Sequence, residues 1–472
     1  MITAKVFSGK NYCVLGLARS GMATAEALLA SGARVTAWDR REEPRAELEG
    51  RATIADPLEI DLSGFDGIVV SPGVPLNTHP IAAKAREAGV PVIGDIELFA
   101  MARPELPPHK VVGITGTNGK STTTALVHHI CKTAGLPTTM GGNIGLPILA
   151  QDPLPEGGVY VLELSSYQID LTYSLDCDVA VLLNITPDHL DRYDDFRAYA
   201  ASKMRLFGMQ TFPHTAIITS EASRQPAIDR GWFTDLQLNR LVAADWDEPG
   251  YLGSAVFDGR AFDEGEEFSN QSYWPSLQGP HNAQNAGAAI CACSNLGLSL
   301  QQIDEGLRTY PGLPHRMERL GEAHGVLFVN DSKATNPAST APALAAYPPE
   351  EGQGPRVHWI CGGLAKDDNL DDCAPHFGNV ACAYTIGEAG PMFADLLEPY
   401  MAVERCELLA EAVSRAVAAA TPGDVILFSP ACASFDQFRD YEARGDSFRE
   451  LAAQIGCNAS PAECGFDTRS AA

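Results

Sequence analysis

Short apolar runs alternate with amphipathic helical patterns along most of the chain. Near the N-terminus, the apolar runs YCVLGL, RVTAWD and GIVVSPG stand beside the helix-like stretch SGMATAEALLASG. Short apolar runs bounded by turn residues predict buried strands, and their alternation with helical patterns predicts largely parallel sheets. We therefore expect an α/β protein whose first and last units are Rossmann-like.

Two breaks in this pattern predict three domains. The breaker-rich stretch ARPELPPHK at 102–110 interrupts the periodicity, and TYPGLPHR marks a second break near 313. A length of 472 residues suits about three domains. Residues 220–276 are less periodic and favour short antiparallel strands. The domains are expected at 1–107, 108–313 and 314–472.

Charge and cysteine content narrow the function classes. The chain has 34 basic and 60 acidic residues and a formal charge of −26, which argues against nucleic acid as a partner. A small nucleotide is still compatible, since a few backbone amides and one lysine can hold it. We expect no membrane insertion, because no apolar run reaches the length of a spanning helix. The 12 cysteines form no CxxC pair, and no leader pattern is recognised, so a cytoplasmic location and a monomer are expected.

The segment GTNGKST at 116–122 has the context of a phosphate-binding loop, because it follows an apolar run and opens a helical pattern. Glycines let the backbone approach phosphate oxygens, and the helix N-terminus adds partial positive charge. Lys120 would neutralise the β and γ oxygens, and the Ser121 hydroxyl would ligate Mg²⁺. The loop departs from the usual GxxxxGK[ST] spacing, which would place a glycine at Ile114. The predicted ATP-binding residues here are Gly116, Thr117, Asn118, Gly119, Lys120, Ser121 and Thr122.

A second glycine turn, GLARSG at 16–21, lies close to the dinucleotide-binding fingerprint, and Asp39 ends the next apolar run. In that fingerprint the second glycine lets the backbone approach a pyrophosphate, and here Ala18 stands in its place. The substitution makes a nicotinamide cofactor a weaker prediction. Tight packing of strand on helix without a ligand stays an alternative. Gly73, at the end of a later apolar run, favours a ligand, because ligands of open α/β sheets gather at the carboxyl ends of strands.

Three further residues of the middle domain are candidates for metal or phosphate chemistry. Glu163 ends the run VYVLEL, where a carboxylate could hold Mg²⁺. His189, in NITPDHLDR, is either a metal ligand or a hydrogen-bonded loop residue. For Lys203, in AYAASKMRLF, the residue type alone predicts a solvent-exposed surface lysine.

The segments GTNGKST, LELSSYQ, NITPDHLDR, AASK, HNAQN, GLPHRME, NDSKATNP and SPACASFDQF occur in this order. Together they resemble the Mur ligases of peptidoglycan synthesis, most closely the branch that adds D-glutamate to UDP-N-acetylmuramoyl-L-alanine. The likeness covers about residues 10–455. It implies a UDP-binding first domain, a central ATP-binding domain and a last domain that binds the amino acid. It also implies ATP-dependent ligation through an acyl phosphate and a tetrahedral intermediate.

The resemblance assigns roles residue by residue. For ATP it adds Asn285, Arg316 and Asp331. For two Mg²⁺ ions it implies Ser121, Glu163 and His189, together with Lys203 carried as a carbamate. The catalytic residues that it implies are Lys120, Glu163, His189 and Lys203. For the UDP part it implies Ala18, Asp39, Arg41 and Gly73, with Asn143 near the muramoyl group. For D-glutamate it implies Lys333, Thr335, Lys366, Ser434 and Tyr441.

Several alternatives remain at this level. Another amino-acid-adding Mur ligase or a folylpolyglutamate synthase would share most of these motifs. A GTPase would need a guanine-reading NKxD motif, and the sequence has none. A dehydrogenase and a non-catalytic nucleotide-binding module are the other two classes. Phosphate release that requires both D-glutamate and the muramoyl nucleotide would separate the first interpretation from these.

Overall fold

The computed structural model describes residues 1–186, 188, 192–219, 241–243, 254–257, 260–263, 266–349, 352–366 and 368–457. The chain packs into two compact units. The first contains Met1–Ser269 and Gln284–Gly306, and the second contains Asn270–Ala283 and the residues from Leu307 on. Each unit is described by itself.

The N-terminal part of the first unit is a five-stranded parallel sheet in the order β3-β2-β1-β4-β5. Its strands are β1 (Asn11–Leu15), β2 (Arg34–Trp38), β3 (Thr53–Ile54), β4 (Gly67–Val70) and β5 (Val92–Ile93). Its helices are α1 (Arg19–Ala30), α2 (Glu42–Ala46), α3 (Ile81–Ala88) and α4 (Asp95–Ala102). This is the predicted Rossmann-like arrangement, and it aligns the carboxyl ends of β1, β2 and β4 at one sheet edge.

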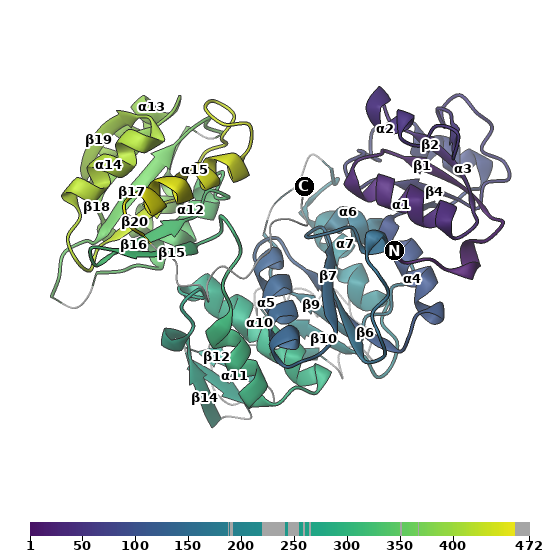
Figure 1. The fold of residues 1–472 in the computed structure, drawn as a ribbon, viewed down its shortest axis with the longest axis horizontal. Coiled ribbons are helices and arrows are strands. Elements are labelled where there is room, and N and C mark those ends of the chain that lie inside the picture. The colour runs from purple at the N-terminus through teal and green to yellow at the C-terminus, as the bar shows by residue number, and fades with distance from the viewer. Residues whose placement is uncertain are drawn as a thin grey trace. The chain divides into compact units, whose positions relative to one another are not determined.

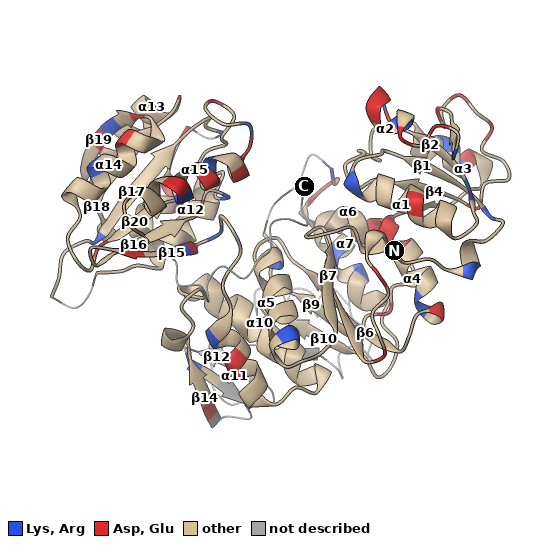
Figure 2. Cartoon of the chain, in the orientation of Figure 1, with Lys and Arg blue, Asp and Glu red and all other residues tan. Residues whose placement is uncertain are grey.

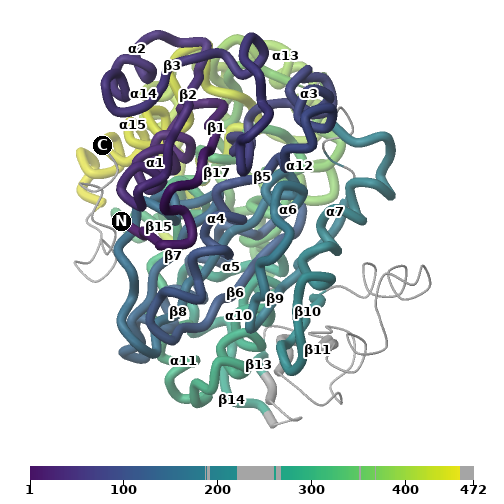
Figure 3. The backbone as a smooth tube through the Cα atoms, turned by 90° about the vertical axis from the view of Figure 1, so that its right-hand side faces the viewer, coloured from purple at the N-terminus to yellow at the C-terminus, as the bar shows by residue number. Residues whose placement is uncertain are grey.

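The middle part is a six-stranded parallel sheet in the order β11-β10-β9-β6-β8-β7 (Figures 1 and 3). Its strands are β6 (His109–Thr115), β7 (Thr138–Gly142), β8 (Gly158–Glu163), β9 (Val179–Leu182), β10 (Thr215–Ile218) and β11 (Leu241–Ala243). Its helices are α5 (Lys120–Thr133), α6 (Ser166–Asp170) and α7 (Phe196–Gly208). Both β8 and β9 are buried along their whole length, as strands of a parallel sheet covered on both faces must be.

The region 220–276 only partly matches the expectation of short antiparallel strands. The strands β12 (Ser254–Phe257) and β13 (Arg260–Asp263) do pair antiparallel, and β14 (Glu266–Asn270) extends that sheet. By contrast, β11 pairs parallel with β10 at the edge of the middle sheet. The first expected break is also shorter, since α4 runs to Ala102 and β6 begins at His109.

Two helices, α10 (Pro280–Leu296) and α11 (Leu300–Thr309), cross the division between the units. The second unit carries a sheet in the order β15-β16-β20-β17-β18-β19, parallel except for the β15–β16 pair. Its strands are β15 (Glu318–Ala323), β16 (Val326–Asn330), β17 (Val357–Gly362), β18 (Val380–Ile386), β19 (Ala402–Glu407) and β20 (Val425–Phe428). Its helices are α12 (Pro337–Ala345), α13 (Gly390–Leu397), α14 (Leu409–Ala419) and α15 (Tyr441–Gln454). The α/β class predicted for the last domain is confirmed.

The surface of the second unit mixes both signs of charge. Figure 2 shows basic and acidic residues interspersed on α14 and α15. The cysteines in the described ranges are free thiols, and all of them except Cys382 are buried. In the part of the chain that is described, no helix is both long and apolar enough to cross a bilayer.

Candidate active site

The phosphate-binding loop connects β6 to α5, as predicted, and its glycines are sterically required. Gly116 and Gly119 have φ angles of 152° and 83°, which L side chains rarely adopt. A Cβ on Gly119 would lie 2.2 Å from Oδ1 of Asn285. The loop can therefore tighten against α10, and Lys120 then begins α5.

Asn184, two residues after the end of β9, holds this loop in shape. Its Oδ1 accepts a 2.8 Å hydrogen bond from the Asn118 amide, and its Nδ2 donates to the Asn118 carbonyl at 3.2 Å. Its own carbonyl accepts from the Thr117 amide at 2.8 Å. The sequence analysis did not single out Asn184, although it is the first polar residue after an apolar run and opens the motif NITPDHLDR.

Two lysines converge on one carbonyl oxygen of the loop. Nζ of Lys120 lies 3.0 Å from the Gly116 oxygen and 2.7 Å from the Thr117 oxygen, and Nζ of Lys203 lies 2.8 Å from the same Gly116 oxygen. The Lys203 side chain is buried, with 2% exposure, and its Nζ lies 4.7 Å from the ring centroid of Tyr199. Burial and the neighbouring Lys120 ammonium lower the pKa of Lys203 to about 7. The surface interpretation of Lys203 is therefore wrong, and the site favours anions.

Glu163 offers a carboxylate oxygen at the same sheet edge. It is the last residue of β8, which lies beside β6, and it is 2% exposed. Its Oε1 accepts a 3.0 Å hydrogen bond from Nδ2 of Asn143, while Oε2 is buried without a hydrogen-bond partner among the described residues. A buried carboxylate oxygen without a partner is costly, and a cation would remove that cost.

The other predicted metal and nucleotide residues fall into three cases. Ser121 and Thr122 are half-buried in the first turn of α5. Asn285 is 4% exposed on α10, and its Oδ1 accepts a 3.2 Å hydrogen bond from the Thr123 hydroxyl. His189 lies outside the described residues. Within the described ranges, no group of three His, Cys, Asp or Glu residues forms a metal site.

The predicted UDP residues lie at the carboxyl edge of the N-terminal sheet. Oδ2 of Asp39 accepts a 2.7 Å hydrogen bond from the Leu17 amide, and Oδ1 accepts from the Arg41 amide at 3.0 Å. Burial acts to raise the pKa of Asp39, but these hydrogen bonds and the Arg41 charge outweigh it and lower that pKa. Ala18 is exposed at the start of α1. The Gly73 carbonyl accepts a 3.3 Å hydrogen bond from the Arg192 guanidinium.

The second unit gathers the remaining predicted residues at the carboxyl ends of β16, β17 and β20. Asp331 follows β16, and its carboxylate accepts hydrogen bonds from the Met317 amide at 3.1 Å and the Ser429 hydroxyl at 2.7 Å. Burial raises the pKa of Asp331 to about 7. Nζ of Lys333 lies 3.6 Å from the ring centroid of Tyr441. Nζ of Lys366 lies 3.5 Å from the Thr335 hydroxyl, Ser434 is buried and Arg316 is half-buried.

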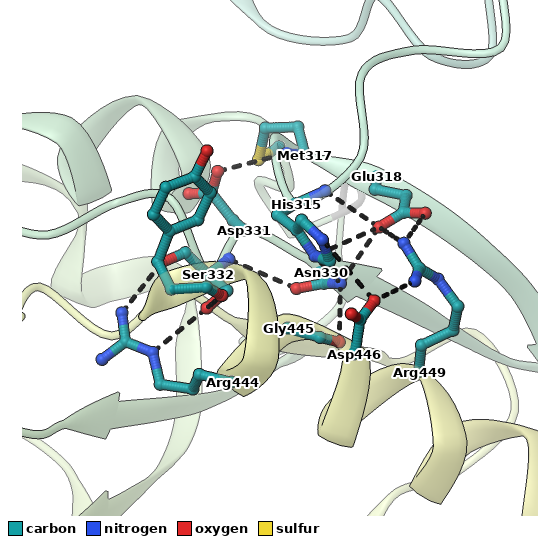
Figure 4. A network of polar contacts seen from close by, with 11 residues as sticks. His315, Met317, Glu318, Asn330, Asp331, Ser332, Arg444, Gly445, Asp446 and Arg449 are labelled. Carbon is teal, nitrogen blue, oxygen red and sulfur yellow. Dashed lines mark hydrogen bonds and ion pairs between the residues drawn. The ribbon is translucent and has the colours of Figure 1, made fainter. Parts of the chain in front are cut away.

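Arg444 was missed by the sequence analysis. It is 1% exposed on α15 and donates to the Ser332 carbonyl at 2.8 Å (Figure 4). It also donates to the Cys432 carbonyl at 3.0 Å and the Ala433 carbonyl at 3.1 Å. Burial lowers the pKa of Arg444 to about 10. This arginine ties the segment after β16 to the segment after β20, and both segments carry residues predicted to bind D-glutamate.

Comparison with known proteins identifies the class. Residues 10–94 match the N-terminal domain of MurD-like Mur ligases, 114–293 match the Mur ligase middle domain, and 315–432 match the Mur ligase glutamate ligase domain. The chain belongs to the Mur ligase family.

The curated relatives have a more particular name. A UDP-N-acetylmuramoylalanine–D-glutamate ligase of Novosphingobium aromaticivorans is 62% identical over 451 residues, or 96% of each chain. The ligase of the same name from Sphingopyxis alaskensis is 59% identical over 457 residues, or 97% of this chain and 100% of that one.

Solved structures support the shared fold. The MurF ligase of Thermotoga maritima in complex with ADP aligns with a TM-score of 0.57 at 16% identity, covering 95% of this chain and 96% of that one. UDP-N-acetylmuramate-alanine ligase MurC of the same organism aligns with a TM-score of 0.56 at 18% identity, covering 94% and 99%. The predicted three-part α/β architecture is therefore confirmed.

Proposed function

We propose that this protein is an ATP-dependent, ADP-forming ligase that adds D-glutamate to UDP-N-acetylmuramoyl-L-alanine in peptidoglycan precursor synthesis. The observation that carries the proposal is the 62% identity, over 96% of both chains, to a ligase of that name. The phosphate-binding loop with two converging lysines supports the use of ATP. Another amino-acid-adding Mur ligase or a folylpolyglutamate synthase remains the alternative.

The reaction needs activation, because an amine does not displace oxygen from a carboxylate directly. Transfer of the γ-phosphoryl group to the carboxylate of the muramoyl nucleotide gives an acyl phosphate with a competent leaving group. The amine of D-glutamate then attacks through a tetrahedral intermediate. Lys120 and the loop amides would offset the negative charge of the phosphate and carboxylate brought together.

The residues at the loop fit Mg²⁺. The unpartnered Glu163 oxygen would accept a cation, and the Ser121 hydroxyl is a hard oxygen ligand on the first turn of α5. Lys203 fits a carbamate, because a pKa of about 7 leaves much of its amine neutral and able to react with CO₂. We propose two Mg²⁺ ions held by Ser121, Glu163, His189 and the Lys203 carbamate. When bound, the ions would offset charge on the transferring phosphoryl group.

The substrate assignments and the finer properties are part of the same proposal. ATP would contact residues 116–122 and Asn285, Arg316 and Asp331. The UDP part would contact Ala18, Asp39, Arg41 and Gly73, and the muramoyl side would contact Asn143. D-glutamate would contact Lys333, Thr335, Lys366, Ser434 and Tyr441. Domain boundaries at 107/108 and 313/314, a cytoplasmic monomer, and the absence of nucleic-acid and membrane partners stay predictions.

Phosphate release, coupled to a colour reaction, tests the function. We expect release only when ATP, UDP-N-acetylmuramoyl-L-alanine and D-glutamate are all present. The panel replaces D-glutamate by L-glutamate, D-alanine, L-alanine or diaminopimelate, and replaces the nucleotide by UDP-N-acetylmuramate or a folate. Turnover that prefers any other pair of substrates would contradict the proposal and identify the alternative.

A further inference from the structure

The backbone around Arg316 is strained on both sides. His315 has a φ of 61° and Met317 a φ of 46°, so both adopt the left-handed conformation that residues other than glycine rarely occupy. Such a conformation persists only where the surroundings hold it. The segment from His315 to Met317 therefore projects Arg316 from a backbone shape that other groups must fix.

Two carboxylates fix that shape. The His315 amide donates to Oε2 of Glu318 at 2.9 Å, and the Met317 amide donates to Oδ1 of Asp331 at 3.1 Å (Figure 4). Each hydrogen bond restrains one of the two left-handed residues. Asp331 is already a predicted ATP contact, whereas Glu318 had no assigned role.

The Glu318 carboxylate is itself held by α15 and β16. The Arg449 guanidinium contacts its Oε1 at 2.8 Å and its Oε2 at 3.1 Å. Nδ2 of the fully buried Asn330 donates to the same Oε2 at 3.0 Å and to the Gly445 carbonyl at 3.1 Å. Arg449 also pairs with Asp446 (Figure 4). Both Glu318 contacts come from the single guanidinium nitrogen Nη2, and such charge-assisted hydrogen bonds are stronger than those between neutral groups.

We propose that Glu318 and Arg449 are positioning residues that hold Arg316 in the orientation needed to bind the phosphates of ATP. The inference rests on the proposed function, which gives Arg316 its contact with ATP. Without Arg449, the carboxylate of Glu318, which is 17% exposed, loses its charged partner and can turn toward water. The His315 amide then loses its acceptor, the left-handed turn relaxes, and Arg316 moves. A displacement of about 1 Å in a positioning group can cost about 100-fold in rate.

The test compares R449M, R449K and E318Q with R415M as the matched control. Arg415, on α14 of the same unit, also makes two ion pairs, with Glu404 and Glu411, and neither partner belongs to the Arg316 segment. We expect R449M and E318Q to raise the KM for ATP about tenfold, with the KM for the muramoyl nucleotide within about twofold. R449K retains the charge but has one nitrogen in place of the two that contact Glu318 and Asp446, so a rise of about threefold is expected. R415M should leave every constant unchanged.

A second measurement separates positioning from general damage. Calorimetric titration of each folded variant with ADP and Mg²⁺ should show the same order of weakening as the KM for ATP. A thermal midpoint near that of wild type, combined with an unchanged KM for ATP and unchanged ADP affinity in R449M and R449K, would overturn the inference. An equal rise in the KM of all three substrates would also overturn it, because that pattern indicates a structural role. If the wild-type protein shows no D-glutamate-dependent turnover, the proposed function fails, and the ADP titration alone decides the positioning role.

Discussion

Replacing Lys203 by Met should make the stability of this protein less dependent on pH. The folded pKa of Lys203 is about 7, lowered by burial and by Lys120, against 10.5 for the free side chain. Between these values the unfolded chain binds the extra proton, so the wild-type protein gains stability as pH rises from 7 toward 10.5. The lowered pKa of Lys203 therefore reduces the free energy of unfolding by about 4 kcal/mol at pH 7 and by about 2 kcal/mol at pH 9. Met has no proton to bind and a similar length.

The expected magnitude follows from the difference between the two proteins. Loss of the hydrogen bond from Lys203 to the Gly116 carbonyl costs about 1 kcal/mol at either pH, so it cancels when the two pH values are compared. The stability advantage of Lys203→Met should therefore shrink by about 2 kcal/mol between pH 7 and pH 9. Urea unfolding of both proteins in CO₂-free buffer, followed by circular dichroism, measures this. An advantage that is the same at both pH values would refute the reasoning, since it would mean that Lys203 titrates normally.

The same two proteins test the carbamate. At pH 7.5, a pKa of about 7 leaves roughly three-quarters of the Lys203 amines neutral, against about one in a thousand for an ordinary lysine. Adding bicarbonate should raise the thermal midpoint of the wild-type protein and not that of Lys203→Met, because CO₂ would bind only the folded amine. ¹³C-labelled bicarbonate should give a carbamate carbon signal in wild type alone. Equal responses in both proteins would leave Lys203 unmodified.

Three further results are expected. Lys120→Ala should lower turnover at least about 100-fold, because it removes a cation of the phosphate loop. The affinity for the muramoyl nucleotide, measured by calorimetry, should stay within about twofold of wild type. Turnover near wild type would contradict the assignment of Lys120 to the phosphate site. Asp95→Asn should raise the thermal midpoint at pH 8 but hardly at pH 4. Burial raises the pKa of the Asp95 carboxyl to about 6, so its ionisation in the folded protein lowers stability as pH rises from 4 through 6. An equal gain at both pH values would contradict this prediction. D-alanine should react about 10⁴-fold less efficiently than D-glutamate in the phosphate assay, because it lacks the second carboxylate that the proposed contacts Lys333 and Lys366 would bind; comparable rates would show that the pocket is misassigned.

Local patterns predicted most of the architecture. Buried parallel strands such as β8 and β9 give continuous apolar runs, and a glycine loop between a strand and a helix is visible within a few residues. The position of β11 was not predictable, because its three residues do not encode which edge they join. The burial of Lys203 could have been predicted, since it lies one helical turn after Tyr199 on the same helix face.

The contacts that shape the site were harder to predict from the sequence. Asn184 acts on the backbone of a segment 66 residues away, and no residue-type pattern says which amide its side chain will reach. Glu318 accepts from an amide only three residues earlier, but the left-handed turn that brings the two together is not visible in the residue types. Arg444 left a signal, because an arginine that falls on the buried face of an amphipathic helix must find carbonyl partners. The residue roles that came from the family resemblance were instead assigned by the order of motifs, which local physical reasoning cannot replace.

The division of the chain into two units has a consequence for dissecting the protein. The chain passes between the units three times, after Ser269, after Ala283 and after Gly306. A fragment that ends at Ser269 would therefore lack Asn285, whose side chain lies against Gly119 of the phosphate loop. One proteolytic cut at any of these three points would leave a segment of one unit covalently attached to the other. A contiguous fragment that keeps the phosphate loop together with Asn285 must consequently carry residues 270–283 of the second unit as well.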